Sequence, residues 1–456
     1  MTDDTRSTSA DGAAPGAPGC PVTLADVDLF CPGAQQHWYD AYPILHNDAP
    51  VQKIAGEGFT PGTDGFILTR HEDIALVVRD PDRFPPTLFL ALEKFAETNT
   101  DLAAQASNDS PGDAPFVNAM MVSMQSLRPN NELWRAHRQE LTDPWVGPGA
   151  SRHEAMIRET VDELLDKLMP RIAAGESVNF VGEFARPLPQ IVMAKILGFP
   201  LSDIPRLEHW GNAQVAAFVN GRGHRNEMTE EQSVAQFETL KEFQAYTDAL
   251  IKARRAEPKD DMISFLTQVT YSALDRTLSD IEINGIVYAM VIGGLETTQY
   301  AIAEQAQLLC ENDGIWNTLD GDRKLLRGFT EEGMRLRSPT QGLSTRITSR
   351  DEVFQGVTVP KGSMLHLRWA AANVDPEEWS CPYALDIQRK AVTRHLVFSQ
   401  GPRVCPGAQL SRLEQVVAWN ALLDRFKSMT YAPGNTFERQ PGIMLGTREL
   451  HLHFTI

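Results

Sequence analysis

The stretch VFSQGPRVCPGAQLSR, residues 397–412, places one cysteine among glycines, prolines and an arginine. Cys405 lies just before an apolar helical pattern, where the helix dipole and free N–H groups would stabilise a thiolate. Arg403 adds a positive charge, and Gly401 and Gly407 would let a bulky group approach the backbone. The residue types alone leave three alternatives for Cys405, namely a metal ligand, a nucleophile or a buried structural cysteine.

The other cysteines and the histidines bear on these alternatives. The remaining cysteines are far apart and have no zinc-type spacing, which favours free thiols in a reducing compartment. They are Cys20, Cys31, Cys310 and Cys381. A nucleophilic Cys405 would need a base, and His395 is the nearest histidine in the sequence.

A second stretch with chemical potential is YAMVIGGLETTQYAIAEQAQLL, residues 288–309. Two glycines and two threonines interrupt an otherwise apolar helical pattern, although each glycine costs about 1 kcal/mol relative to alanine. Close packing against another helix would explain the glycines. A local opening of the helical hydrogen bonds, in which small molecules can sit, would explain them equally.

The elements that must position these stretches are mostly helices. Helices are predicted for residues 35–46, 71–80, 279–312, 324–337 and 408–426 and for most of 130–256. Strands are predicted for residues 51–55, 65–70, 343–349, 352–360, 363–369, 443–445 and 449–456. Because both ends of the chain contribute to the minor sheet, we expect a single domain at 21–456. The small, polar and Pro/Gly-rich residues 1–20 predict a disordered tail. The long polar stretch 97–115 is typical of an access lid.

Composition excludes some classes of function. The chain has 456 residues, 42% hydrophobic and 22% charged, and a formal net charge of −18. This acidity argues against a nucleic-acid-binding protein, which needs a basic face. No apolar run approaches the roughly 20 residues that span a bilayer, and the N-terminus lacks the features of a signal peptide. The expectation is a cytoplasmic protein without a membrane anchor.

The Cys405 stretch resembles the haem-binding signature of the cytochrome P450 superfamily. FSQGPRVCPG matches F-x-x-G-x-R/H-x-C-x-G, whose fixed positions here are Phe398, Gly401, Arg403, Cys405 and Gly407. Other segments resemble further landmarks of the family, in the same order and with the right spacing over most of the chain. They are GGLETT (293–298), EGMR (332–335), AANVDP (371–376) and DIQR (386–389).

The resemblance implies a fold. It is mainly α with minor β sheets, the triangular helical prism of the family, with haem b between the long central helix and the helix that follows the cysteine loop. Two positions depart from the pattern, because Val374 stands in place of an arginine and Ser399 stands where many relatives carry glycine.

The resemblance also assigns haem contacts. Cys405 would be the axial thiolate ligand of the iron. Backbone N–H groups of Gly407 and Ala408 would hydrogen-bond the sulfur, because Pro406 has none. The propionates would be held by Arg403, Arg346 and the one-face pair Trp134 and Arg138, whereas His137 is expected on the surface. Glu332, Arg335 and Arg389 would form a buried structural network.

On the other side of the haem, the resemblance makes Glu296 and Thr297 the acid–alcohol pair that delivers protons during oxygen activation. Thr298 is expected to be structural. The substrate pocket is predicted to be apolar. Its predicted residues are Phe116, Val117, Met120, Ala217, Phe218, Val291, Gly293, Leu343 and Met444.

These assignments imply a haem-thiolate monooxygenase. It would insert one atom of O2 into an unactivated C–H bond of a compact hydrophobic substrate, such as a terpenoid, steroid or aromatic compound. Electrons would come from a separate 2Fe-2S ferredoxin and its NAD(P)H-dependent reductase, docking at a local basic face with Arg128, Arg135 and Arg412. The alternatives are a peroxide-driven peroxygenase, a haem-thiolate isomerase or dehydratase, and a non-enzymatic haem sensor.

Overall fold

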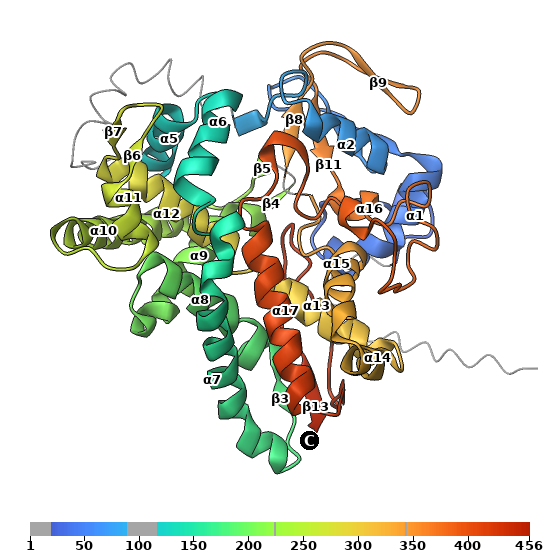
Figure 1. Ribbon diagram of the computed structural model, residues 1–456. Helices are drawn as coiled ribbons and strands as arrows, with labels where there is room; N and C mark the ends of the chain where they lie inside the picture. Colours follow the sequence, from blue (N-terminus) through green and yellow to red (C-terminus); the bar gives the residue numbers. More distant parts are fainter. Residues whose placement is uncertain (1–19, 89–115, 223–224, 343) are drawn as a thin grey trace, which may run out of the picture.

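The computed structural model describes residues 20–88, 116–222, 225–342 and 344–456. Helices form most of this structure (Figure 1). Their bounds are α1 (Trp38–Asp48), α2 (His71–Arg79), α5 (Phe116–Leu127), α6 (Asn131–His137), α7 (Glu154–Ala173), α8 (Pro187–Leu197), α9 (Ile204–Val219), α10 (Glu230–Ala256), α11 (Met262–Gln268), α12 (Asp280–Gly294), α13 (Thr297–Glu311), α14 (Ile315–Gly321), α15 (Leu326–Leu336), α16 (Trp369–Ala372) and α17 (Ala408–Arg425). The predicted helix-dominated fold with minor sheets is confirmed. The predicted tail, up to residue 19, and the stretch 97–115 lie outside the described residues.

The strands form small sheets. Their bounds are β1 (Val51–Ile54), β2 (Gly65–Leu68), β3 (Val178–Asn179), β4 (Gly221–Arg222), β5 (Arg225–Asn226), β6 (Thr270–Tyr271), β7 (Arg276–Thr277), β8 (Thr345–Ile347), β9 (Glu352–Phe354), β10 (Val357–Val359), β11 (Met364–Leu367), β12 (Ser428–Tyr431) and β13 (His451–Thr455). The largest sheet has the order β1-β2-β11-β8, with β2 and β11 parallel. It joins the N-terminal part of the chain to the segment before the cysteine loop.

The prediction of a terminal strand pair is wrong in its first member. Residues 443–445 form no strand, and β13 pairs with β12 and β3 instead. Arg439 and Thr447 form an isolated bridge, and residues 443–445 lie in the loop between them. The backbone of Leu445 then bonds to Pro339, and Ile443 accepts a bond from Gln341.

The central helix is divided in two, where the sequence predicts one helix over 279–312. α12 begins with a capping box of Ser279 and Glu282 and ends at Gly294, and α13 begins at Thr297. The two glycines before the break have different surroundings. A Cβ on Gly294 would lie 2.7 Å from the side chain of Met193, whereas a Cβ on Gly293 would meet no atom within 4 Å. Close packing therefore accounts for Gly294, and a local opening accounts for Gly293.

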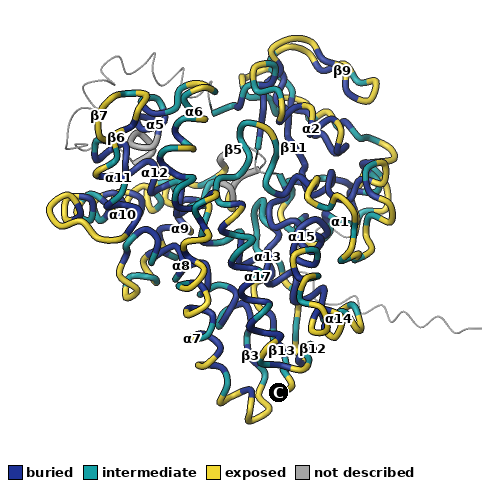
Figure 2. The backbone as a smooth tube through the Cα atoms, viewed as in Figure 1, coloured by how far each residue is buried: buried dark blue, intermediate teal, exposed yellow. Residues whose placement is uncertain are grey.

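The main hydrophobic core lies between α7, α8, α12, α13 and α17. α7 buries a residue every third or fourth position, beginning with Ile157, Val161 and Leu164, as its periodicity predicts. Figure 2 shows buried chain in the centre around α13 and α17 and exposed chain at the periphery, for example along α10. Within the described ranges, no helix has both the length and the apolar character that crossing a bilayer requires.

Candidate active site

The cysteine loop is fixed by its own backbone and by α2. The N–H of Cys405 donates to the carbonyl of Phe398 at 2.8 Å. Gly401 has a φ of +73°, and a Cβ there would lie 2.7 Å from the carbonyl oxygen of Val78 in α2. Gly401 therefore allows the left-handed backbone of the loop and its close packing on α2, and its contact with haem stays a prediction.

The surroundings of the Cys405 sulfur favour a metal ligand over a nucleophile. Burial raises the pKa of the Cys405 thiol, and the N–H groups of Gly407 and Ala408 and the charges of Arg138 and Arg412 oppose that rise. The N–H groups of Gly407 and Ala408 therefore favour the thiolate, as the sequence predicts, while hydrogen bonds to an iron-bound sulfur stay a prediction. His395 is engaged with Glu331 at 2.9 Å and is not placed as a base. A thiol with a raised pKa becomes a thiolate most readily when it binds a metal.

Three arginines gather near the cysteine loop. Arg403 and Arg128 stack on the ring of Trp134, with guanidinium carbons 3.9 and 4.5 Å from its centroid. Burial lowers the pKa of Arg128 and of Arg346 to about 10. Burial, together with the charges of Arg346 and Arg128, lowers the pKa of Arg403 to about 9. The cluster therefore concentrates positive charge within the protein.

This positive site fits the haem that the signature implies. Arg346 donates to the carbonyl of Thr345 at 2.8 Å, while its Nε is buried with no partner among the described residues. Neither Arg346 nor Arg128 forms an ion pair with a carboxylate in the described ranges. Two propionates would supply the missing anions. A Cβ on Gly407 would meet no protein atom within 4 Å, which leaves room beside the sulfur.

Trp134 and Arg138 have different surroundings, and the prediction that both hold a propionate stays a prediction. The Nε of Arg138 is buried with no hydrogen-bond partner among the described residues. Trp134 joins the arginine cluster, but Arg138 follows the end of α6, where a π-helical turn begins. Arg138 donates to the carbonyl of Val404 and pairs with Asp143 at 3.2 Å. It braces the cysteine loop.

His137 corrects a second expectation about this segment. The sequence places it on the surface, but the side chain is buried. Its two ring nitrogens have no hydrogen-bond partner among the described residues. Burial and the charges of Arg128 and Arg138 lower the pKa of His137 well below its usual value. The histidine is therefore neutral beside these two arginines.

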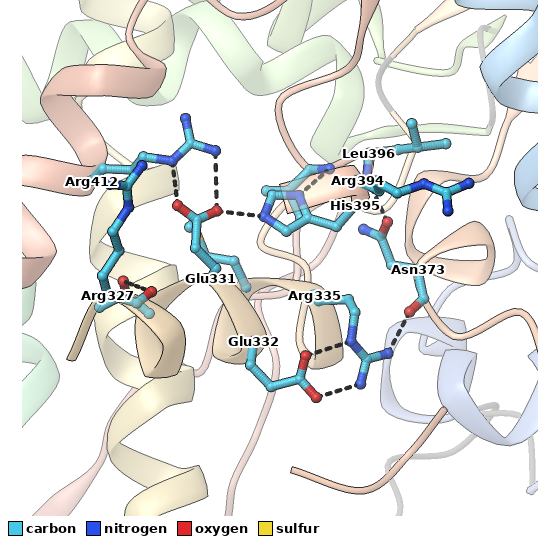
Figure 3. A network of polar contacts seen from close by, with 12 residues as sticks. Arg327, Glu331, Glu332, Arg335, Asn373, Arg394, His395, Leu396 and Arg412 are labelled. Carbon is cyan, nitrogen blue, oxygen red and sulfur yellow. Dashed lines mark hydrogen bonds and ion pairs between the residues drawn. The ribbon is translucent and has the colours of Figure 1, made fainter. Parts of the chain in front are cut away.

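The predicted network of Glu332, Arg335 and Arg389 is confirmed. Figure 3 shows Arg335 paired through two bonds with Glu332, at 2.7 and 2.8 Å. Arg389 reaches the same carboxylate at 2.9 Å, and Arg335 also donates to the carbonyl of Asn373 at 2.6 Å. Both Glu332 and Arg335 are fully buried.

A second network in Figure 3 joins α15 to the cysteine helix. Glu331 accepts from Arg412 at 2.5 Å and contacts His395 at 2.9 Å. Although burial alone would raise it, the hydrogen bonds and charges of His395 and Arg412 lower the pKa of Glu331 to about 2. Arg412 is thus committed to an internal carboxylate.

The three arginines predicted to dock a redox partner lie in different surroundings. Arg412 pairs with Glu331, and Arg128 belongs to the internal arginine cluster. Arg135 is exposed on α6. The sequence did not distinguish these positions, because which face of a short helix is covered depends on contacts with distant segments.

Glu296 and Thr297 lie at the break between α12 and α13. Thr297 Oγ1 donates to the carbonyl of Gly293 at 3.0 Å and so spans the break. Burial raises the pKa of Glu296, which Tyr300 hydrogen-bonds. Glu296, Thr297 and Gly293 all line a cavity of about 560 Å³. Thr298 bonds to Ser411 of α17 at 3.0 Å, in keeping with a structural role.

Tyr300 is a site residue that the sequence prediction missed. It lies four residues after Glu296, which puts both on one helix face, and this spacing was the available signal. A Cβ on Gly446 would lie 2.3 Å from the Tyr300 ring, so the absence of a side chain there lets the ring pack close. Tyr300 also lines the cavity.

Only part of the predicted pocket can be compared with the structure. Gly293 and Met444 line the cavity. Val291 does not line this cavity. It is two positions from Gly293 on the helix and packs fully buried in the core. Ala217 does not line the cavity either, although Val215, Ala216 and Val219 do. The side chains of Phe116, Val117, Met120 and Phe218, and all of Leu343, lie outside the described residues.

The cavity wall is less apolar than predicted. Polar side chains contribute to it from α8, from α9, from the start of α13 and from the segment before Met444. They are Arg186, Gln190, Glu208, Asn212, Gln299 and Gln440. A ligand there can therefore meet hydrogen-bonding groups as well as apolar ones.

Ser399 carries backbone strain that predicts a stabilising substitution. Its φ is +58°, and its hydroxyl is buried with no partner among the described residues. Ser399→Gly should raise the free energy of unfolding by about 1 kcal/mol, because glycine adopts this conformation without a Cβ penalty. Urea unfolding measures this effect. Ser233→Gly, inside α10, is the control and should destabilise. A loss of stability in Ser399→Gly would contradict the strain.

Comparison with known proteins identifies the family. A family model described as Cytochrome P450 matches residues 304–454. The chain is 31% identical over 394 residues to the biotin biosynthesis cytochrome P450 of Bacillus subtilis, covering 86% of this chain and 90% of that protein. It is 30% identical over 407 residues to the polyketide biosynthesis cytochrome P450 PksS of Bacillus subtilis, covering 89% and 93%.

A solved structure extends the similarity to the fold. The crystal structure of P450BioI in complex with acyl carrier protein ligated to hexadec-9Z-enoic acid has a TM-score of 0.74 and 25% identity, covering 92% of this chain and 99% of that chain. The chain belongs to the cytochrome P450 family of monooxygenases, which bind haem through a cysteine thiolate.

Proposed function

We propose that this monooxygenase inserts one oxygen atom of O2 into an unactivated C–H bond of a largely apolar substrate. The observation that carries the proposal is the Glu296–Thr297 pair at a helix break beside the cavity. We further propose that electrons come from a separate 2Fe-2S ferredoxin and an NAD(P)H-dependent ferredoxin reductase. Terpenoids, steroids and aromatic compounds are candidate substrates.

The haem would be held from both sides of the cysteine loop. Cys405 would supply the thiolate ligand, with Gly407 and Ala408 donating to the sulfur. Arg346, Arg403 and Arg128 would hold the propionates, with Trp134 as the platform on which Arg403 and Arg128 stack. When bound, haem supplies the activation of O2, which no side chain of the chain can perform.

The residues on the cavity side would manage protons and substrate. Because its pKa is raised, Glu296 keeps its proton to a higher pH than an exposed glutamate and can give it up within the cavity. Tyr300 fixes the Glu296 carboxyl by its hydrogen bond. Thr297 presents a hydroxyl at the same wall, where it can pass a proton on. A peroxygenase, an isomerase or a haem sensor would not need this pair.

Arg135 is the exposed residue that we propose for contact with the redox partner. Such contacts are weak and sensitive to salt. Product formation with NADH, surrogate ferredoxin and reductase tests the proposed function. A substrate should also shift the spin state of the haem spectrum. Product formed only with hydrogen peroxide would favour the peroxygenase, and spectral binding without any product would favour the sensor.

Thr297→Ala should uncouple oxygen consumption from product formation. Without the hydroxyl, proton delivery is impaired, and we expect the product formed per O2 consumed to fall about tenfold or more. Oxygen uptake, hydrogen peroxide and product should be measured together. Thr298→Ala is the matched control, because its hydroxyl bonds to Ser411 and it should keep its coupling. Unchanged coupling in Thr297→Ala would rule out the relay.

A further inference from the structure

Arg368 is buried without an anionic partner. Its side chain follows β11 and is only 2% exposed. The guanidinium lies 4.4 Å from the ring of Trp38 and 5.8 Å from that of Tyr42, and its Nε donates to the Tyr42 hydroxyl at 3.2 Å. Nη2 has no hydrogen-bond partner among the described residues. The aromatic rings offset part of the desolvation cost but leave N–H groups unused.

The other buried arginines show how unusual this is. Five arginines are buried among the described residues. Arg70, Arg254 and Arg335 each pair with a buried carboxylate, at 2.7, 2.5 and 2.7 Å. Arg346 and Arg368 do not pair with a carboxylate in the described ranges. Arg346 lies in the cluster assigned to the haem propionates, so Arg368 is the case that remains without an assigned anion.

Arg368 lines a second cavity, of about 220 Å³. Its wall is largely apolar and includes Leu29, Phe30 and Trp38 from the segment before and at the start of α1. Trp38 is fixed there by a bond from its Nε1 to the carbonyl of Leu29 at 3.0 Å. Arg368 thus adds a cationic side chain to a mainly apolar wall that also contains Gln35, Asn220 and Glu227.

The second cavity adjoins the cavity of about 560 Å³ that Glu296 and Thr297 line, which is called the main cavity below. Four residues line both cavities, two at the end of α9 and two in the segment before Met444. They are Val219, Asn220, Pro441 and Ile443. A molecule that occupied both cavities would have one end at Arg368 and the other beside Gly293 and Thr297.

We propose that Arg368 binds the carboxylate of the substrate. The substrate class is then an apolar carboxylic acid whose body extends past the shared wall to the Thr297 side. A carboxylate accepts charge-assisted hydrogen bonds from a guanidinium in a matching geometry. This inference rests on the proposed function, because it takes the main cavity as the place of oxidation. Glu227, an exposed acidic residue of the lining, has no ion pair with Arg368.

Calorimetric titration of the holoenzyme tests the role of Arg368. The probes are octanoic, dodecanoic and hexadecanoic acids, each beside its methyl ester. At least one acid should bind the wild type more tightly than its ester. Arg368→Gln should lower the affinity for that acid about 10- to 100-fold and change the affinity for the ester by less than about threefold. Glu227→Gln should leave the acid unchanged or tighten it.

Arg152→Gln is the matched control. Arg152 also stacks on a tryptophan, 4.3 Å from the ring of Trp145, but lines neither cavity. It should not change acid affinity. If Arg368→Gln does not fold, Arg368→Lys replaces it. Arg368→Lys keeps the charge, so the ratio of its affinities for acid and ester should still favour the acid, as in the wild type.

The outcomes separate this inference from the proposed function. Equal affinity of acid and ester in the wild type, loss of both in Arg368→Gln, or no binding by any probe would overturn the carboxylate assignment. An ester that is bound and oxygenated as well as its acid would leave the monooxygenase proposal intact. An acid that depends on Arg368 for binding but gives no product with ferredoxin and reductase would retain the carboxylate site and remove the proposed function.

Discussion

Replacing Cys405 by alanine is expected to abolish the red-shifted absorbance band that the reduced, carbon monoxide-treated protein gives when a thiolate binds the iron. Turnover should fall by more than about 100-fold, because losing even an outer-shell partner of a metal ligand costs about 10- to 100-fold. The difference spectrum and the haem content, measured on the same sample, check this. The loop itself should remain, since Phe398 bonds to the backbone of residue 405.

Two other cysteines supply controls for this experiment. Cys310 is half-buried on α13, and Cys381 is exposed. Burial raises the pKa of the Cys310 thiol to about 12, so this thiol stays protonated at neutral pH. Cys310→Ala and Cys381→Ala should keep the band. A Cys405→Ala protein that kept it would show that another residue ligates the iron.

The electrostatics explain why Cys405 should bind metal and not act alone. Two backbone N–H groups and two arginines favour the thiolate, yet burial outweighs them and the pKa stays raised. A nucleophile would need a base to take its proton, and His395 is held by Glu331. Iron removes that need, because coordination deprotonates the thiol directly.

The sequence predicts those site residues that belong to short motifs better than those placed by contacts between distant segments. Cys405, Glu296 and Thr297 occupy fixed positions in short motifs, and the structure places the last two at one cavity wall. The bond pattern at the sulfur also followed from local chemistry, since Pro406 has no N–H. The residues that the sequence does not predict are placed by tertiary contacts. Arg128 enters the cluster because Trp134 offers a ring to both Arg128 and Arg403.

Helix phase and strand pairing also depend on contacts between distant segments. An apolar residue in α12 can face a cavity or the core, and Val291 faces the core because only packing against neighbouring helices sets the phase. Apolar character likewise predicts a strand at 443–445, but the partner of β13 is chosen by long-range pairing with β12 and β3. Neither choice is encoded within the segment itself.

Glu332→Gln should strongly lower the free energy of unfolding, because it changes a buried ion pair. The carboxylate of Glu332 receives Arg335 and Arg389, and both Glu332 and Arg335 are fully buried. Glutamine has nearly the same shape but leaves a buried guanidinium without its charge partner. Breaking such a pair costs about 3–5 kcal/mol. Urea unfolding of the haem-free and haem-loaded proteins measures the change.

The exposed pair of Arg158 and Glu154 on α7 is the matched control. It has a similar distance, 3.1 Å, but half-exposed side chains. Glu154→Gln should cost less than about 0.5 kcal/mol. In a double-mutant cycle, Glu332→Gln with Arg335→Met should cost less than the sum of the single changes. A Glu332→Gln protein as stable as the wild type would show that the network is not structural.

The loss should extend to haem retention, because the network continues to the cysteine loop. Arg335 donates to the carbonyl of Asn373, and the side-chain oxygen of Asn373 accepts the N–H of Leu396 at 2.6 Å (Figure 3). Leu396 lies two residues before Phe398, whose carbonyl receives the N–H of Cys405. Glu332→Gln should therefore loosen the loop and speed haem transfer to apomyoglobin, whereas Glu154→Gln should not. Destabilisation with an unchanged rate of haem loss would separate the network from the cysteine loop.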